Sequence, residues 1–156
     1  MTERSVTHAT FVVERVYDAA PARVFKAFVD PAAKRRWFAE GEGWQVDEFT
    51  VDFRVGGFER SRFRFQGGVP IRNDTTYQDI VPNQRIIIAY TMTIGENPIS
   101  SSLATMEFKH EGSGTRLVFT EQGAFLDGHD NVAQREAGTR ELLESLDKEL
   151  KRQVAA

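Results

Sequence analysis

The chain has 156 residues, of which 40% are hydrophobic and 28% are charged, and its formal net charge is −3. This composition predicts one globular domain over residues 1–156 and excludes a disordered chain. The acidic balance argues against a general nucleic-acid binder, which carries basic residues over a whole face. The absence of cysteine excludes disulfides, thiol chemistry and cysteine-ligated metals.

The N-terminal sequence MTERSVTHATF lacks the apolar stretch of a signal peptide. No segment of the chain reaches the length of apolar sequence that crosses a bilayer. We therefore expect a cytoplasmic protein without a membrane span.

The first predicted elements are a strand and two short helices. The segment ATFVVERVYDA, residues 9–19, alternates its side chains as a strand does. Pro21 suits the first turn of a helix over residues 21–29, because its φ angle is already helical. Asp30 and Pro31 repeat this pattern, with Asp30 as the N-cap of a second short helix.

From residue 44 to 122 the apolar residues recur with a period of two, which is typical of β-strands. A long helix is predicted from about Asn131 to Arg152, where leucines recur every four residues. One strand, two short helices, about six antiparallel strands and a long helix predict an α+β fold. Such a curved antiparallel sheet can wrap the last helix and leave a cavity between them. Turn sequences separate the strands at Gly56-Gly57, Gly67-Gly68, Pro82-Asn83, GENP and EGSG.

Four segments, VYDAAPARVFKAFVDPAAKRRWF, VGGFERSRF, TYQDIVPNQRIIIAY and GSGTRLVFTEQGAF, resemble a known superfamily and cover nearly the whole chain in order. The chain is similar to START-like (SRPBCC, birch-pollen-allergen-like) proteins, in the branch of activator-of-heat-shock-chaperone-ATPase-like proteins. This resemblance implies a helix-grip fold, in which about seven strands hold the C-terminal helix above a pocket closed at one edge by the two short helices. The superfamily includes lipid carriers, aromatic-polyketide cyclases and co-chaperone domains.

One departure from the resemblance lies in the last helix. Such proteins often carry Gly-Trp there, whereas this chain has Gly138 and Thr139. The missing indole volume predicts that the pocket is deepest beneath these two residues, with Arg135 on one side and Leu142 on the other.

The segment DPAAKRRWF places three cations before two large aromatic residues. We expect Lys34, Arg35 and Arg36 to stay in solvent. Trp37 and Phe38 then turn inward, either as plain core or as walls of the pocket.

Two charged residues have two interpretations each. Arg135 shares a face of the last helix with Leu142, so it either donates to an anionic ligand group or lies where the helix projects into solvent. Glu121 faces inward if the strand alternation continues past Phe119, and it lies at the rim if the strand ends at Thr120. For Arg135 we favour the solvent position, because charged residues are seldom buried. For Glu121 we favour the rim position, because the ends of strands are the hardest boundaries to place from sequence.

Other patterns point to structure rather than to chemistry. In RSRFRF, alternation places the arginines on the convex face and Phe63 and Phe65 on the concave face, which explains the pattern better than nucleic-acid binding does. His8, His110 and His129 have no metal-ligand spacing, so neither a metal nor a cofactor is expected.

The predicted function is binding of a small hydrophobic or amphipathic molecule, such as a lipid, without established catalysis. One alternative is a protein-binding chaperone ATPase regulator of the stress response. Another is a cyclase or hydrolase, for which Glu121 is the single candidate acid and no catalytic residue is assigned. The sequence leaves open whether the protein is a monomer or a homodimer. The predicted ligand-binding residues are Trp37, Phe38, Phe63, Phe65, Tyr90, Met92, Met106, Phe108, Phe119, Glu121, Arg135, Gly138, Thr139 and Leu142.

Overall fold

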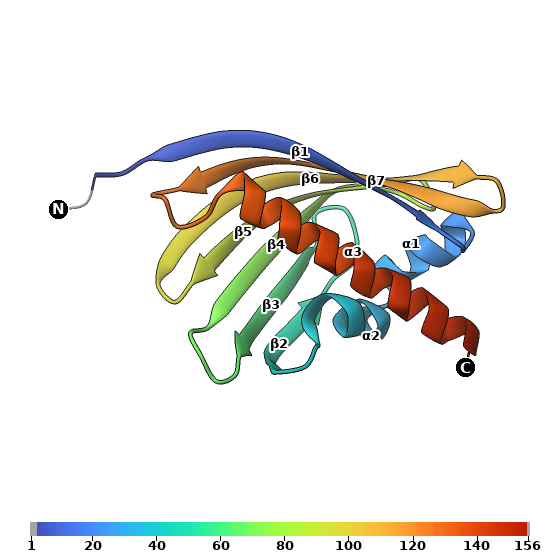
Figure 1. Cartoon of the computed structure of the whole chain (residues 1–156), viewed down its shortest axis with the longest axis horizontal. Helices are drawn as coiled ribbons and strands as arrows, with labels where there is room; N and C mark the ends of the chain where they lie inside the picture. Colours follow the sequence, from blue (N-terminus) through green and yellow to red (C-terminus); the bar gives the residue numbers. More distant parts are fainter. Residues whose placement is uncertain (1–2, 156) are drawn as a thin grey trace.

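A computed structural model describes residues 3–155, which form a single antiparallel sheet and three α-helices. The seven strands follow the order β1-β7-β6-β5-β4-β3-β2, so the first strand of the chain pairs with the last. Figure 1 shows the sheet curving around the long C-terminal helix. The strands are β1 (Val6–Tyr17), β2 (Trp44–Val51), β3 (Phe58–Phe65), β4 (Ile71–Val81), β5 (Arg85–Ile94), β6 (Asn97–Glu111) and β7 (Gly114–Leu126).

The helices are α1 (Pro21–Val29), α2 (Pro31–Lys34) and α3 (Val132–Ala155), and α2 continues into a π-helical turn, η1 (Arg35–Ala39). As predicted, Asp30 caps α2: its Oδ1 accepts a hydrogen bond from the Ala32 backbone N–H at 3.0 Å. None of the helices within residues 3–155 combines the length and the apolar character required to cross a bilayer.

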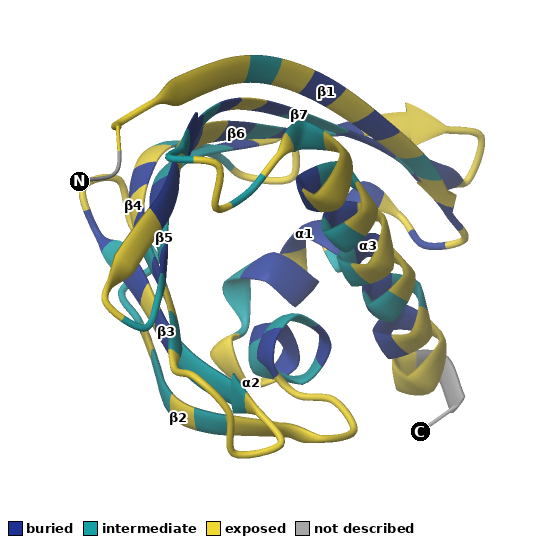
Figure 2. Cartoon of the chain, turned by 60° about the vertical axis from the view of Figure 1, so that its left-hand side comes forward, coloured by how far each residue is buried: buried dark blue, intermediate teal, exposed yellow. Residues whose placement is uncertain are grey.

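The concave face of the sheet supplies the core. α1 and α3 pack inside the curve of the sheet, and the outward side of α3 is exposed (Figure 2). Tyr17 on β1 fixes α3 directly, because its buried hydroxyl donates to the Leu143 carbonyl at 2.8 Å. The predicted α+β helix-grip architecture is therefore confirmed.

β7 extends beyond Thr120, where the favoured interpretation of the sequence ended the strand. β1 and β7 pair without interruption from Val6 opposite Leu126 to Tyr17 opposite Thr115. Because β1 supplies hydrogen-bonding partners along this whole length, β7 does not end at Thr120. The side-chain alternation therefore continues through Glu121, which points to the concave face.

Candidate ligand-binding cavity

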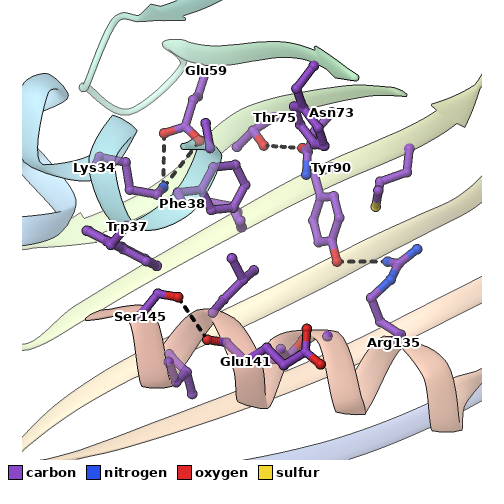
Figure 3. Close-up of a pocket in the computed structure, with 18 of the residues that line it drawn as sticks. Lys34, Trp37, Phe38, Glu59, Asn73, Thr75, Tyr90, Arg135, Glu141 and Ser145 are labelled. Carbon is purple, nitrogen blue, oxygen red and sulfur yellow. Dashed lines mark hydrogen bonds and ion pairs between the residues drawn. The ribbon is translucent and has the colours of Figure 1, made fainter. Parts of the chain in front are cut away.

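A cavity of about 570 Å³ lies between the concave face of the sheet, α3 and the α2–η1 segment. Four groups of side chains surround it: an apolar wall, two buried clusters of charged residues, and a polar floor on β4 (Figure 3). The apolar wall is made of Phe28, Trp37, Phe38, Phe53, Phe63, Ile86, Ile88, Met92, Ile94, Ile99, Met106, Phe119, Leu142 and Leu143.

The structure places all but two of the predicted binding residues around this cavity, and their role in binding stays a prediction. Phe108 was placed wrongly: it packs in the core against Phe25 and Phe28, with ring centroids 5.4 Å and 5.3 Å away, because α1 covers that part of the sheet. Phe65 was also placed wrongly. It lies at the end of β3, is 47% exposed, and packs 5.1 Å from the ring of Trp44.

Arg135 on α3 is the centre of one buried group, the arginine cluster. Its Nη1 donates to Tyr90 Oη at 2.8 Å and to Glu121 Oε2 at 3.2 Å. Its Nη2 donates to Ser100 Oγ at 2.7 Å and to Asp130 Oδ2 at 2.5 Å. The side chains of Arg135 and Glu121 are only 9% and 1% exposed. The favoured interpretations, with Arg135 in solvent and Glu121 at the rim, are therefore wrong, because each supplies the partner that makes burial of the other tolerable.

Burial and hydrogen bonding have opposite effects on the pKa of Glu121, the acid of the arginine cluster. Burial raises the pKa of Glu121, while the hydrogen bond from Tyr90 and the guanidinium of Arg135 lower it. Burial also raises the pKa of Tyr90, so its phenol keeps its proton and donates to both oxygens of Glu121 at 2.8 Å. Both terminal nitrogens of Arg135 thus have partners, so the cluster is an internal network and not an open anion clamp.

Lys34 at the end of α2 forms the second group, the lysine cluster. Its Nζ donates to the two carboxylate oxygens of Glu59 at 3.1 Å and 3.2 Å, and the Tyr77 hydroxyl donates to Glu59 Oε1 at 2.9 Å. Lys34 is 9% exposed, so the prediction that it stays in solvent is wrong. Its ammonium lies 4.6 Å from the centroid of Phe38, which adds a cation–π contact to the ion pair.

The rest of the basic segment is tied to the protein as well. Arg36 forms a paired hydrogen bond with Glu149 of α3, at 2.8 Å and 3.0 Å, so it joins η1 to the last helix and is not a free surface cation. Arg35 is partly exposed and pairs with Glu40 at 2.8 Å. Trp37 donates its Nε1–H to the Ala27 carbonyl at 2.9 Å and is 5% exposed. Trp37 therefore belongs to the core and to the cavity wall at once.

The floor of the cavity carries two polar residues of β4 that the sequence analysis missed. Thr75 Oγ1 donates to Asn73 Oδ1 at 3.2 Å, and both residues are buried. One end of the Asn73 amide forms this bond, which leaves the other end for a molecule in the cavity. The signal was the alternation Asn73, Thr75, Tyr77, which places three polar groups on the inward face of a strand.

Gly138 and Thr139 lie beside open space, as expected from their small side chains. Both line the cavity, and a Cβ built on Gly138 has no atom within 4 Å. Thr139 is 5% exposed and faces inward between Arg135 and Leu142, as predicted. Within residues 3–155, no group of His, Asp and Glu side chains is arranged to hold a metal ion.

The comparisons with known proteins bear on this architecture. The family model described as activator of Hsp90 ATPase homolog 1-like protein matches residues 18–151. The chain belongs to this family. The resemblance predicted from its sequence is thereby confirmed. Comparison with curated proteins finds no significant match.

Solved structures of bacterial proteins share the fold of this chain. A protein from Rhizobium loti is 54% identical, with a TM-score of 0.87 over 93% of this chain and 99% of the other. An uncharacterised protein from Rhizobium leguminosarum is 48% identical, with a TM-score of 0.92 over 97% and 99% of the two chains. A protein from Chromobacterium violaceum is 25% identical, with a TM-score of 0.75 over 89% and 94%.

Proposed function

We propose that the protein binds one small, largely apolar molecule in the cavity between the sheet and α3. The observation that carries this proposal is the volume of about 570 Å³ between elements that are otherwise closely packed. Protein interiors are packed to the density of organic crystals, and voids larger than a water molecule are few. Small-molecule pockets typically measure about 300–1,000 Å³. The cavity is open to solvent and lined mainly by apolar side chains, so an apolar molecule that displaces poorly ordered water from it gains affinity.

The lining favours a ligand with a flat or polycyclic apolar body. Trp37, Phe38 and Phe63 present aromatic rings to the cavity, and Met92 and Met106 add flexible side chains that adapt to different shapes. Few polar groups are free to orient such a ligand. The free end of the Asn73 amide is the best placed of them, and it suits a hydroxyl or carbonyl group on the ligand.

Family membership supports this proposal at the level of the fold. The chain belongs to a START-like family whose architecture suits ligand binding, with the sheet and the last helix as the two walls of a pocket. Small-molecule binding requires a cavity accessible from solvent, and the exposed residues Gly41, Glu42 and Glu141 line this one where it opens.

The proposal is tested by titrating the protein with N-phenylnaphthylamine, a neutral dye whose fluorescence rises in apolar surroundings. The expected result is saturable binding with one dye per chain. Thr139→Trp should abolish it, because the new indole occupies the cavity. Arg140→Trp is the matched control, because Arg140 is the exposed neighbour of Thr139 on the same helix. Equal dye binding by the two variants, or no binding by the unmodified protein, would contradict the proposal.

A further inference from the structure

We infer that the cavity selects its ligand by charge: it takes a neutral or positively charged molecule, such as an aromatic amine, and rejects carboxylates. This inference rests on the proposed function and names the chemical class of the ligand. It follows from the balance of charged groups around the cavity. Six carboxylates line it, and four of them already pair with a cation: Glu40 with Arg35, Glu59 with Lys34, and Glu121 and Asp130 with Arg135. Glu42 and Glu141 are left without a cation among the described residues.

Both cations that line the cavity already have carboxylate partners. The terminal nitrogens of Arg135 donate to Tyr90, Ser100 and two carboxylates. Lys34 is engaged by Glu59 and surrounded by aromatic rings. A ligand carboxylate beside either cation would therefore lie next to a carboxylate that already compensates its charge, so it gains little attraction and meets repulsion from that carboxylate.

Two of the lining carboxylates are exposed to solvent and unpaired within the described part of the chain. Glu42 and Glu141 are exposed and line the cavity, and neither forms an ion pair within residues 3–155. Figure 3 shows Glu141 on α3 below the cavity, between the lysine and the arginine clusters. An entering anion therefore meets uncompensated negative charge, whereas an ammonium group meets two free acceptors.

An exposed aromatic ring lines the cavity as well. Trp44 lines the cavity, is 39% exposed, and packs with its ring centroid 5.4 Å from that of Phe63. The face of an indole ring attracts a cation, and a neighbouring carboxylate strengthens this attraction. The protein already uses the combination once, because Lys34 lies against both Phe38 and Glu59. Trp44 and Glu42, which are two residues apart in the chain, both exposed and both lining the cavity, offer the same two kinds of group to a ligand.

The test compares three competitors that share one aromatic body: naphthylmethylamine, naphthylmethanol and naphthoate. Each compound is titrated into the unmodified protein with bound N-phenylnaphthylamine, at low ionic strength and neutral pH, and displacement of the dye gives its affinity. We expect the amine to bind at least as tightly as the alcohol, and the naphthoate to bind roughly fivefold to tenfold more weakly than the alcohol, because Glu42 and Glu141 repel its charge. Salt should reduce the preference for the amine.

Matched variants locate the effect. Glu141→Gln should reduce the ratio of amine to naphthoate affinity severalfold, and Glu42→Gln should act in the same direction. Glu136→Gln removes the same charge from α3 outside the cavity, where Glu136 pairs with Arg140, and should leave the ratio unchanged. Naphthoate binding as tight as that of the alcohol, or equal ratios in Glu141→Gln and Glu136→Gln, would overturn charge selection while leaving the proposed cavity intact. Failure of the dye and of every competitor to bind would instead overturn the proposed function, and the inference with it.

Discussion

Replacing Arg135 with methionine tests the arginine cluster most severely. The change removes the cation that holds two buried carboxylates, Glu121 and Asp130, whose side chains are 1% and 10% exposed. Loss of one partner from a buried ion pair typically lowers the free energy of unfolding by about 3–5 kcal/mol. For a chain of this size, about 2–4 °C of melting temperature corresponds to each kcal/mol, so the expected decrease is about 6–20 °C.

The assay is urea unfolding at neutral pH, followed by circular dichroism. Arg140→Met is the matched control. Arg140 forms an exposed ion pair with Glu136, one helical turn away, so its loss should change stability by less than about 1 kcal/mol. Adding Glu121→Leu to Arg135→Met should restore more than half of the lost stability, because it removes the stranded charge. Equal losses in Arg135→Met and Arg140→Met, or no recovery in the double variant, would refute this account of the cluster.

Three further changes test other parts of the structure. Thr139→Trp should preserve or raise the melting temperature of the ligand-free protein, measured by calorimetry, because it fills empty space; a clear decrease would mean that the site is already packed. Burial raises the pKa of Glu121 above its ordinary value of 4.5. The Glu121 carboxyl group therefore binds its proton more tightly in the folded protein than in the unfolded chain. Stability should therefore fall as the pH rises from about 4.5 through the folded-state pKa, and Glu121→Gln should remove this part of the pH dependence in unfolding curves. Lys34→Met should lower the free energy of unfolding by about 3–5 kcal/mol, because it leaves Glu59 buried and unpaired, whereas Arg35→Met should change it by less than about 1 kcal/mol; similar losses in both would show that the lysine cluster contributes no special stability.

The fold could be predicted because its signals are local. Pro21 and the Asp30-Pro31 pair mark the starts of the two short helices, and the turn sequences mark the ends of strands. These features depend on neighbours in the sequence, so the order of elements and the curved sheet around α3 agree with the structure.

The apolar wall of the cavity was predictable for the same reason, whereas the charged clusters were not. Alternation on β5 and β6 identifies Tyr90, Met92 and Met106 as inward-facing. Burial of Lys34, in contrast, depends on Glu59, which lies 25 residues away in the sequence and on another element. Lysine side chains are usually exposed to solvent. Lys34 is buried only because the folded chain brings Glu59 next to it.

Glu121 shows the same limit in a strand. Its orientation follows from alternation, but whether the strand extends that far depends on β1, whose residues pair with β7 across the whole sequence. Its partner Arg135 comes from α3, so the two interpretations could be separated only by the tertiary structure. Phe65 was predicted to line the cavity but lies beyond it. Alternation along β3 gives the side of the strand on which Phe65 lies, but not the point along the strand at which the cavity ends.

The central claim is that a small apolar molecule occupies the cavity, and the methyl groups of Met92 and Met106 report on it most directly. Both side chains line the cavity, and the chain contains only three methionines, so their methyl resonances are readily resolved after ¹³C labelling. Adding N-phenylnaphthylamine should shift both resonances, by ring currents from the bound dye, until one equivalent is present. Unchanged Met92 and Met106 resonances while the dye fluorescence still rises would place the dye elsewhere on the protein and contradict the claim.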